Sequence, residues 1–223
     1  MIPLRDSTRS RTTPWVTWLL IAANVLVFLY ELGLRPKEQA VLSVIYGVVP
    51  ARYSLPGFPA GPAGLFLPLV TAMFLHGGWL HLLGNMIYLW VFGDNVEDRM
   101  GHGRFLTFYL LVGLLANLAH IYFNPLSEVP TIGASGAIAG VLGAYFISFP
   151  RARVLTLVPI GIFLTAIEVP ALLLLLFWFL LQLVSGLFAG PAQTVAWWAH
   201  VGGFIAGAAL AGVFRRRRNP WLV

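Results

Sequence analysis

Residues 133–149 read GASGAIAGVLGAYFISF, an uncharged segment rich in glycine and alanine with Ser135 near its start. We predict a helix from Ser135 to Phe149, because Pro150 follows and disfavours helical geometry in the residue before it. A helix of this length covers roughly 22 Å, less than the roughly 30 Å of a bilayer core. If Pro150 marks one membrane surface, Ser135 therefore lies below the other.

Glycines line one face of this predicted helix. Gly136, Gly140 and Gly143 fall at positions i, i+4 and i+7, so they share a face of the helix. Ser135 borders this face at the start of the helix. The pattern predicts a strip with almost no side chain on which a second helix packs. We assign Gly133, just before the helix, to the same close packing.

A second glycine strip lies nearer the C-terminus, in residues 194–214. His200, Gly203 and Gly207 fall at i, i+3 and i+7, which places the imidazole at the head of an equally smooth face. Faces of small residues let membrane helices approach closely. We therefore predict that the two strips pack together and bring Ser135 within hydrogen-bonding reach of His200.

The composition identifies the class of protein. Over 223 residues the chain is 59% hydrophobic and 10% charged, far too apolar for a soluble domain of this length. Cysteine is absent, which excludes a disulfide framework, a thiolate nucleophile and a Cys-ligated metal. The net charge of +6 comes from basic residues that flank apolar segments, so it indicates membrane topology rather than a nucleic-acid partner.

Six segments are apolar enough to cross a bilayer. We therefore expect an all-α membrane protein, a six-transmembrane-helix bundle in residues 14–214. It lies between an N-terminal tail of residues 1–13 and a basic C-terminal tail of residues 215–223. The predicted spans are residues 12–30, 79–92, 105–123, 135–149, 170–187 and 194–214.

Three segments between the spans carry loop signals. Residues 31–68 hold several prolines and charges, so we expect a loop that lies in the membrane interface. Residues 94–104 are charged, which predicts a short connection after the second span. Residues 154–167 are apolar but contain Pro159 and Gly161, so we expect a surface-lying or re-entrant piece.

The distribution of lysine and arginine predicts the orientation. Of the 14 basic residues, 11 lie on the side that carries both termini: three before the first span, two in each of two loops and four directly after the last span. The positive-inside rule therefore places both termini in the cytoplasm. His81, Ser135 and His200 then lie near the extracytoplasmic side, with His200 about two turns into its helix.

The polar residues of these spans suggest a reaction site. Ionisable groups at membrane depth are rare, and His200 and His81 need polar partners there. The first amides of the helix that starts at Ser135 have no intrahelical partner. Such amides are tolerated where they line a watery cavity, and there they donate to an oxyanion. We therefore expect a hydrolytic site supplied with water.

Three motifs together resemble the signature set of the rhomboid intramembrane serine proteases. They occur in the family order and on the corresponding spans, and the resemblance covers about residues 69–207. The motifs are His81-x-x-x-Asn85, Gly133-Ala134-Ser135-Gly136 and Ala199-His200-x-x-Gly203-x-x-x-Gly207.

The resemblance implies a serine endopeptidase that hydrolyses peptide bonds of transmembrane protein substrates near the extracytoplasmic surface. Ser135 then corresponds to the nucleophile and His200 to the general base. His81 and Asn85 correspond to the side chains that stabilise the oxyanion. We expect no cofactor, no metal and no nucleic-acid partner. The expected partners are transmembrane substrates and membrane lipid, and the expected location is a bacterial cell (inner) membrane with a multi-pass topology.

The chain departs from the family pattern at two places. In some rhomboids a tyrosine four residues after the nucleophile stacks on the catalytic histidine, but this chain has Ala139 there. The base must therefore be oriented in another way. Some members carry a Trp-Arg pair in the first long loop where this chain reads Leu67-Pro68, which affects the anchoring of that loop.

Other interpretations of these residues compete with catalysis. Alone, Ser135 is typical of helix packing, Asn85 of contacts between helices, and His81 of an interfacial anchor. A catalytically dead relative that binds transmembrane clients is an alternative, but it has no need of both Ser135 and His200. A transporter or channel is another, although we find neither internal repeats nor a charged pathway.

The remaining polar residues carry weaker signals. His76 lacks the carboxylate and the spacing of a zinc site. Three aromatic or polar residues of the fifth span, Trp178, Phe179 and Gln182, fit either a substrate gate or a lipid-facing or core position. We expect His102 to be solvated, His120 to be interfacial, and Glu168 to pair with Arg151 or Arg153.

Overall fold

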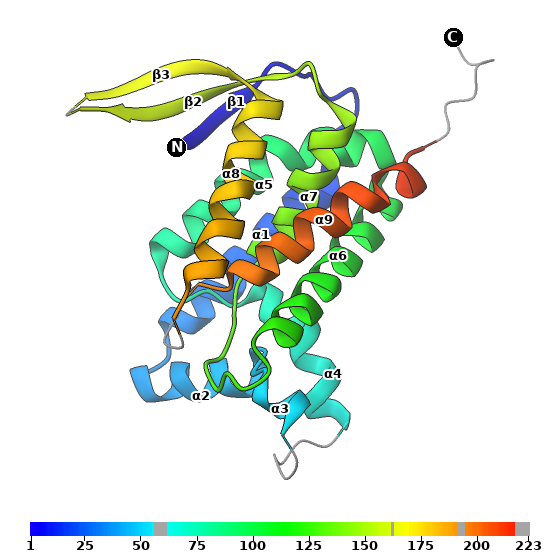
Figure 1. Ribbon diagram of the computed structural model, residues 1–223. Coiled ribbons are helices and arrows are strands. Elements are labelled where there is room, and N and C mark those ends of the chain that lie inside the picture. Colours follow the sequence, from blue (N-terminus) through cyan, green and yellow to red (C-terminus); the bar gives the residue numbers. More distant parts are fainter. Residues whose placement is uncertain (56–61, 162, 191–194, 217–223) are drawn as a thin grey trace.

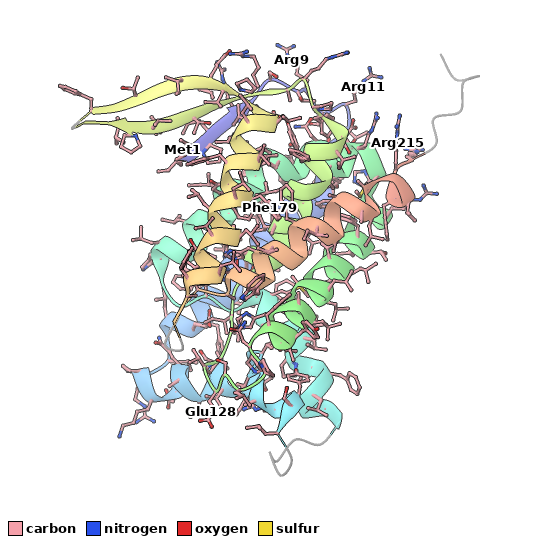
Figure 2. The ribbon with its side chains drawn as sticks, in the orientation of Figure 1. Met1, Arg9, Arg11, Glu128, Phe179 and Arg215 are labelled. Atoms are coloured by element: carbon pink, nitrogen blue, oxygen red, sulfur yellow. The ribbon has the colours of Figure 1, made fainter. Side chains whose placement is uncertain are left out.

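The computed structural model describes residues 1–55, 62–161, 163–190 and 195–216 and is mainly helical. The long helices form a bundle with a small sheet at one end, which we call the sheet end, and the short helices at the other (Figure 1). Met1 and Arg215 lie at the sheet end, and Glu128 lies at the opposite end (Figure 2). Both termini of the described chain are therefore on the same side of the bundle.

Several helices are suited to cross a membrane, and the chain is an integral membrane protein. Among the described residues, four pass by length and composition. A fifth span is possible if residues 63–74 are joined to the next long helix, with a bend of 80° between them. The four are α1 (Trp15–Leu32), α6 (His102–Phe123), α8 (Ala171–Phe188) and α9 (Trp197–Phe214), and the helix after the bend is α5 (Trp79–Met100).

The fourth predicted span, residues 135–149, is the shortest of the long helices in the bundle core. This helix, α7 (Ser135–Ser148), has 14 residues and begins at the predicted residue. It is apolar but too short to pass as a full span on its own. The predicted segment is thus helical, while the count of six spans remains a prediction.

The predicted end of the second span was wrong. Instead of ending near Phe92, α5 continues to Met100 and breaks at Gly101, whose φ is 82°. The helix can continue through the charged residues beyond Phe92 because one of them, Glu97, is buried and bonded to another helix. Glu97 accepts hydrogen bonds from the Thr17 backbone N–H at 2.7 Å and from its hydroxyl at 2.6 Å, so it caps the start of α1.

The predicted interfacial loop in residues 31–68 contains helices in its described parts. Proline is tolerated in the first turn of a helix, as at Pro36, so a high proline content did not exclude helices here. The Glu38 carboxylate also accepts the Arg35 backbone N–H at 2.9 Å, which caps α2. The helices are α2 (Pro36–Tyr46), α3 (Ala51–Ser54) and α4 (Pro62–Thr71), followed by the 3-10 turn η1 (Ala72–Phe74).

The expectation of an all-α fold was incomplete, because three strands form an antiparallel sheet in the order β1-β2-β3. The prediction of a re-entrant piece in residues 154–167 was wrong. This segment is a hairpin of β2 (Arg153–Ile160) and β3 (Phe163–Pro170), with Gly161 at its turn. The predicted N-terminal tail contributes β1 (Ile2–Asp6), which pairs with β2.

Two polar contacts hold the sheet in place. The Asp6 carboxylate accepts hydrogen bonds from the Tyr145 hydroxyl of α7 and from Asn95 Nδ2 of α5, the latter at 3.0 Å. Burial raises the pKa of the Asp6 carboxyl above its ordinary value, an effect that the Tyr145 hydrogen bond partly offsets. Arg153 Nε lies 3.3 Å from Glu168 Oε2, so Glu168 pairs with Arg153, one of its two predicted alternatives.

The centre of the bundle is the contact between α7 and α9. A Cβ on Gly203 would overlap the carbonyl oxygen of Gly136, and a Cβ on Gly207 would overlap that of Gly140. The two helix backbones therefore touch along both glycine strips, as predicted. This contact fixes the distance between the first turns of α7 and α9, where Ser135 and His200 lie.

Candidate active site

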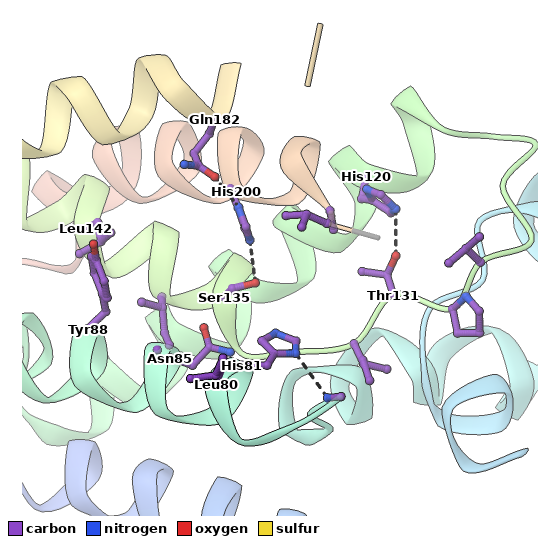
Figure 3. Close-up of a pocket in the computed structure, with 18 of the residues that line it drawn as sticks. Leu80, His81, Asn85, Tyr88, His120, Thr131, Ser135, Leu142, Gln182 and His200 are labelled. Atoms are coloured by element: carbon purple, nitrogen blue, oxygen red, sulfur yellow. Dashed lines mark hydrogen bonds between the residues drawn. The ribbon is translucent and has the colours of Figure 1, made fainter. Parts of the chain in front are cut away.

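Ser135 and His200 meet at the start of their helices. Ser135 is the first residue of α7, and His200 lies one turn into α9. The Ser135 Oγ lies 2.7 Å from the His200 Nε2 (Figure 3). The predicted contact is therefore confirmed, but the depth of His200 was overestimated because α9 begins at Trp197 rather than near residue 194.

The other imidazole nitrogen of His200 has a partner that we did not expect. His200 Nδ1 lies 2.8 Å from the Oε1 of Gln182 on α8. We had left a substrate gate, a lipid-facing surface and a core position open for this segment, and the Gln182 side chain faces the bundle interior and is 7% exposed. A single glutamine in a segment as apolar as α8 was the available signal, because polar groups in membrane helices usually face the interior.

Two tryptophans flank the imidazole of His200. The ring centroid of Trp178, from α8, lies 5.9 Å away at an interplanar angle of 36°. The ring of Trp197 lies 6.2 Å away and is nearly perpendicular. These rings occupy the neighbourhood of the base, where Ala139 supplies no aromatic side chain.

His81 and Asn85 lie on α5 and line the same cavity as Ser135 (Figure 3). His81 Nδ1 accepts a hydrogen bond from the Gly77 N–H at 3.4 Å. Asn85 Nδ2 donates to the His76 Nε2 at 2.9 Å. Both side chains are thus held at the cavity wall, and their role toward an oxyanion stays a prediction.

His76 has a structural partner on each side. Its Nδ1 lies 3.3 Å from the Phe74 carbonyl oxygen, which only accepts, so the Nδ1 carries the proton and Nε2 accepts from Asn85. Its backbone N–H donates to the Glu31 carboxylate at 3.1 Å. His76 therefore connects the end of α1 to Asn85. Within the described residues, no group of three His, Asp or Glu side chains is placed to hold a metal ion.

Gly133 is required by its conformation and by its neighbours. Its φ of 124° is one that side chains rarely adopt, and its N–H donates to the Ala72 carbonyl at 2.8 Å. A Cβ at this position would lie 2.6 Å from His81 Nε2 and 3.6 Å from Asn85 Nδ2. We predicted helix packing for Gly133, but it packs against the cavity side chains instead.

Two other histidines have hydrogen-bond partners that the sequence did not reveal. His120 is buried within the bundle, and its Nε2 lies 2.9 Å from the Thr131 hydroxyl at the far side of the cavity (Figure 3). His102 is exposed, as predicted, and its Nδ1 also lies 2.5 Å from the Glu97 carboxylate. His102 therefore belongs to the cap of α1 and not to the site.

The cavity that holds these groups has a volume of about 670 Å³. This size is within the range of sites that take small molecules or short segments of chain. Apolar side chains such as Ile138 and Leu142 lie beside Ser135, His200 and Asn85 in its wall. The site thus combines a hydroxyl, a histidine in contact with it and amide donors, the groups needed for acyl transfer.

Comparison with known proteins agrees with the sequence motifs. A family model described as Rhomboid domain matches residues 64–217. The chain is 35% identical over 211 residues to the rhomboid protease GluP of Bacillus subtilis (strain 168), across 92% of this chain and 37% of that protein. It is 28% identical over 155 residues to RHOMBOID-like protein 5 of Arabidopsis thaliana, across 59% of this chain and 50% of that protein.

A human relative gives the same result. The chain is 32% identical over 139 residues to the presenilin-associated rhomboid-like protein, mitochondrial, of Homo sapiens, across 60% of this chain and 33% of that protein. The alignments thus cover half or less of the length of these three relatives. The family model covers more than half of this chain, and the chain belongs to the rhomboid family.

Proposed function

We propose that this protein is an intramembrane serine endopeptidase that cleaves transmembrane protein substrates near the extracytoplasmic membrane surface. The observation that carries the proposal is the 2.7 Å contact between Ser135 Oγ and His200 Nε2 beside a cavity of about 670 Å³. A serine hydroxyl needs an adjacent base to become a nucleophile. Family membership supports the same activity, since GluP is named a rhomboid protease.

The reaction proceeds in two halves. Ser135 Oγ attacks the peptide carbonyl carbon while His200 Nε2 takes its proton, and His200 then returns the proton to the leaving amine. A water molecule next attacks the acyl-enzyme, with His200 again acting as base, and releases the new carboxyl group and the Ser135 hydroxyl.

The oxyanion of each tetrahedral intermediate is stabilised by donors around Ser135. The Ser135 backbone N–H is in the first turn of α7, where amides have no intrahelical partner. Asn85 Nδ2 carries a second N–H besides the one that it donates to His76, and His81 lines the same cavity. Each donor of this kind contributes roughly 3 to 4 kcal/mol to the transition state.

In this proposal, residues 14–214 form six membrane spans, and the short helix α7 is the fourth of them. Residues 1–13 and 215–223 lie in the cytoplasm, and the site opens toward the extracytoplasmic side of a bacterial inner membrane. Arg9, Arg11 and Arg215 at the sheet end support this orientation by the positive-inside rule (Figure 2). The proposed partners are transmembrane substrates and lipid, without cofactor or nucleic acid.

The experiment that tests the proposal uses the purified protein in liposomes with a panel of single-span reporter proteins. We expect the parent to cleave at least one reporter within or beside its transmembrane segment. Ser135→Ala removes the nucleophile and is expected to yield no product. Equal product from both proteins would contradict the proposed activity, and binding without cleavage by the parent would favour a catalytically dead relative.

A further inference from the structure

Gln182 on α8 is oriented by its own helix. Its Nε2 donates to the Trp178 carbonyl oxygen at 3.2 Å, one turn earlier. A carbonyl oxygen only accepts, so this contact requires the amide nitrogen of Gln182 on that side. The amide oxygen therefore faces His200, whose Nδ1 lies 2.8 Å away.

This orientation determines the tautomer of His200. Because Gln182 Oε1 only accepts, the His200 Nδ1 must carry the proton. A neutral imidazole has one N–H, so Nε2 bears a lone pair toward Ser135 Oγ at 2.7 Å. The Ser135 hydroxyl then donates to Nε2, which is the arrangement that a general base requires.

We propose that Gln182 is a positioning residue that holds His200 in the tautomer and ring orientation in which it acts as base toward Ser135. The inference rests on the proposed function and adds a third member to the Ser135–His200 pair. Both contacting side chains are buried, with exposed fractions of 7% for Gln182 and 9% for His200, so water does not compete freely for Nδ1.

The contact gains strength during the reaction. When His200 takes the serine proton, the Nδ1–H···Oε1 hydrogen bond has a charged donor, and such bonds are roughly twice as strong as neutral ones. Glutamine supplies this acceptor without the cost of a buried negative charge. Because Gln182 and Trp178 both lie on α8, a displacement of this helix away from α9 removes the acceptor and a flanking ring together.

The test measures how fast a small fluorophosphonate labels Ser135 in the purified full chain in detergent. Gln182→Leu keeps the volume of the side chain but removes the acceptor. We expect labelling about ten- to a hundredfold slower, the fold-change that corresponds to one lost hydrogen bond to a charged group. Gln182→Glu keeps an oxygen within reach of Nδ1 and is expected to recover most of the rate.

The labelling rate separates positioning from gating. A small soluble probe does not have to pass between helices as a transmembrane substrate does, so a residue that only gates leaves labelling unchanged. With a cleaved reporter, loss of positioning lowers kcat and leaves KM near the parental value. Gln182→Met is a second variant without the acceptor, and it serves if Gln182→Leu fails to fold.

Phe179→Leu is the matched control on the same helix. Its ring contacts Phe204 of α9 at 4.8 Å between centroids, so the substitution loosens α8 without removing the acceptor of His200. We expect parental labelling from this variant. Parental labelling by Gln182→Leu, or equal slowing by Phe179→Leu, would overturn the inference. A parent chain whose Ser135 is never labelled would instead overturn the proposed function.

Discussion

The contact between the glycine strips predicts a large effect from one methyl group. In Gly207→Ala the new Cβ would overlap the Gly140 carbonyl oxygen and would lie 2.6 Å from the Gly140 Cα. Carbon atoms pack at about 3.5 to 4.0 Å, so α7 and α9 must separate by about 1 Å. Added to the 2.7 Å between Ser135 Oγ and His200 Nε2, this shift exceeds the range of a hydrogen bond.

Two measurements follow from this shift. Overpacking of this kind costs about 1 to 3 kcal/mol, so we expect a lower unfolding temperature in detergent. A displacement of about 1 Å at a catalytic pair costs on the order of a hundredfold in rate, so we expect fluorophosphonate labelling of Ser135 to slow by about that factor. Labelling is measured well below the unfolding temperature of the variant, so that unfolding does not contribute.

Gly212→Ala is the control for Gly207→Ala. Gly212 lies on the same helix, and a Cβ there would meet nothing within 4 Å. We expect parental labelling and equal or slightly higher stability, because alanine favours helices more than glycine does. Parental labelling by Gly207→Ala would show that the strip contact does not set the geometry of the site.

The remaining predictions concern three other positions. Gly133→Ala strains a backbone with φ of 124° and places a Cβ 2.6 Å from His81 Nε2, so reporter cleavage should fall at least about tenfold. Parental cleavage would exclude a role in catalysis for the segment that precedes Ser135. Glu97→Ala removes the acceptor of the Thr17 N–H and hydroxyl and should lower the free energy of unfolding by about 1 to 3 kcal/mol, measured by denaturant titration, whereas an unchanged midpoint would contradict the cap. Burial raises the pKa of Asp6 in the folded protein, so the folded state binds its proton more readily than the unfolded chain. Stability from this group is present below the unfolded pKa and is lost as the pH rises through the folded value; Asp6→Asn should therefore flatten the pH dependence of the unfolding temperature, and an unchanged slope would rule this out.

The contact between Ser135 and His200 was predictable because it depends on local spacing. Helical periodicity alone places Gly136 and Gly140 on one face and Gly203 and Gly207 on another. Close packing of the two faces then places Ser135 and His200, at the starts of the two strips, beside each other. No other pair of spans offered two such strips, so the pairing of α7 with α9 did not require knowledge of the fold.

The sheet was not predictable by the same means. Residues 154–167 are apolar with a proline and a glycine, a pattern shared by hairpins and by pieces that lie in a membrane surface. The remaining strand, β1, pairs with β2 although the two are far apart in the sequence, with Ile2 opposite Leu157. Pairing between segments so far apart leaves no signal in the spacing of either one.

The contacts of buried polar residues were the other gap. Glu97 and Gln182 were visible as polar residues, but each finds its partner on another helix. Periodicity assigns a residue to a face and not to an atom on a neighbouring helix. The end of α5 and the orientation of His200 both depend on such contacts. The predicted end of α5 was therefore wrong, and the orientation of His200 could not be predicted.

The most direct test of the account is cleavage of one single-span reporter in liposomes by the parent, Ser135→Ala and His200→Ala, with matched protein amounts and confirmed folding. If the contact between Ser135 and His200 is catalytic, the parent cuts the reporter and both variants yield no product. Cleavage by Ser135→Ala or His200→Ala at the parental rate would contradict a catalytic role for the contact between Ser135 and His200.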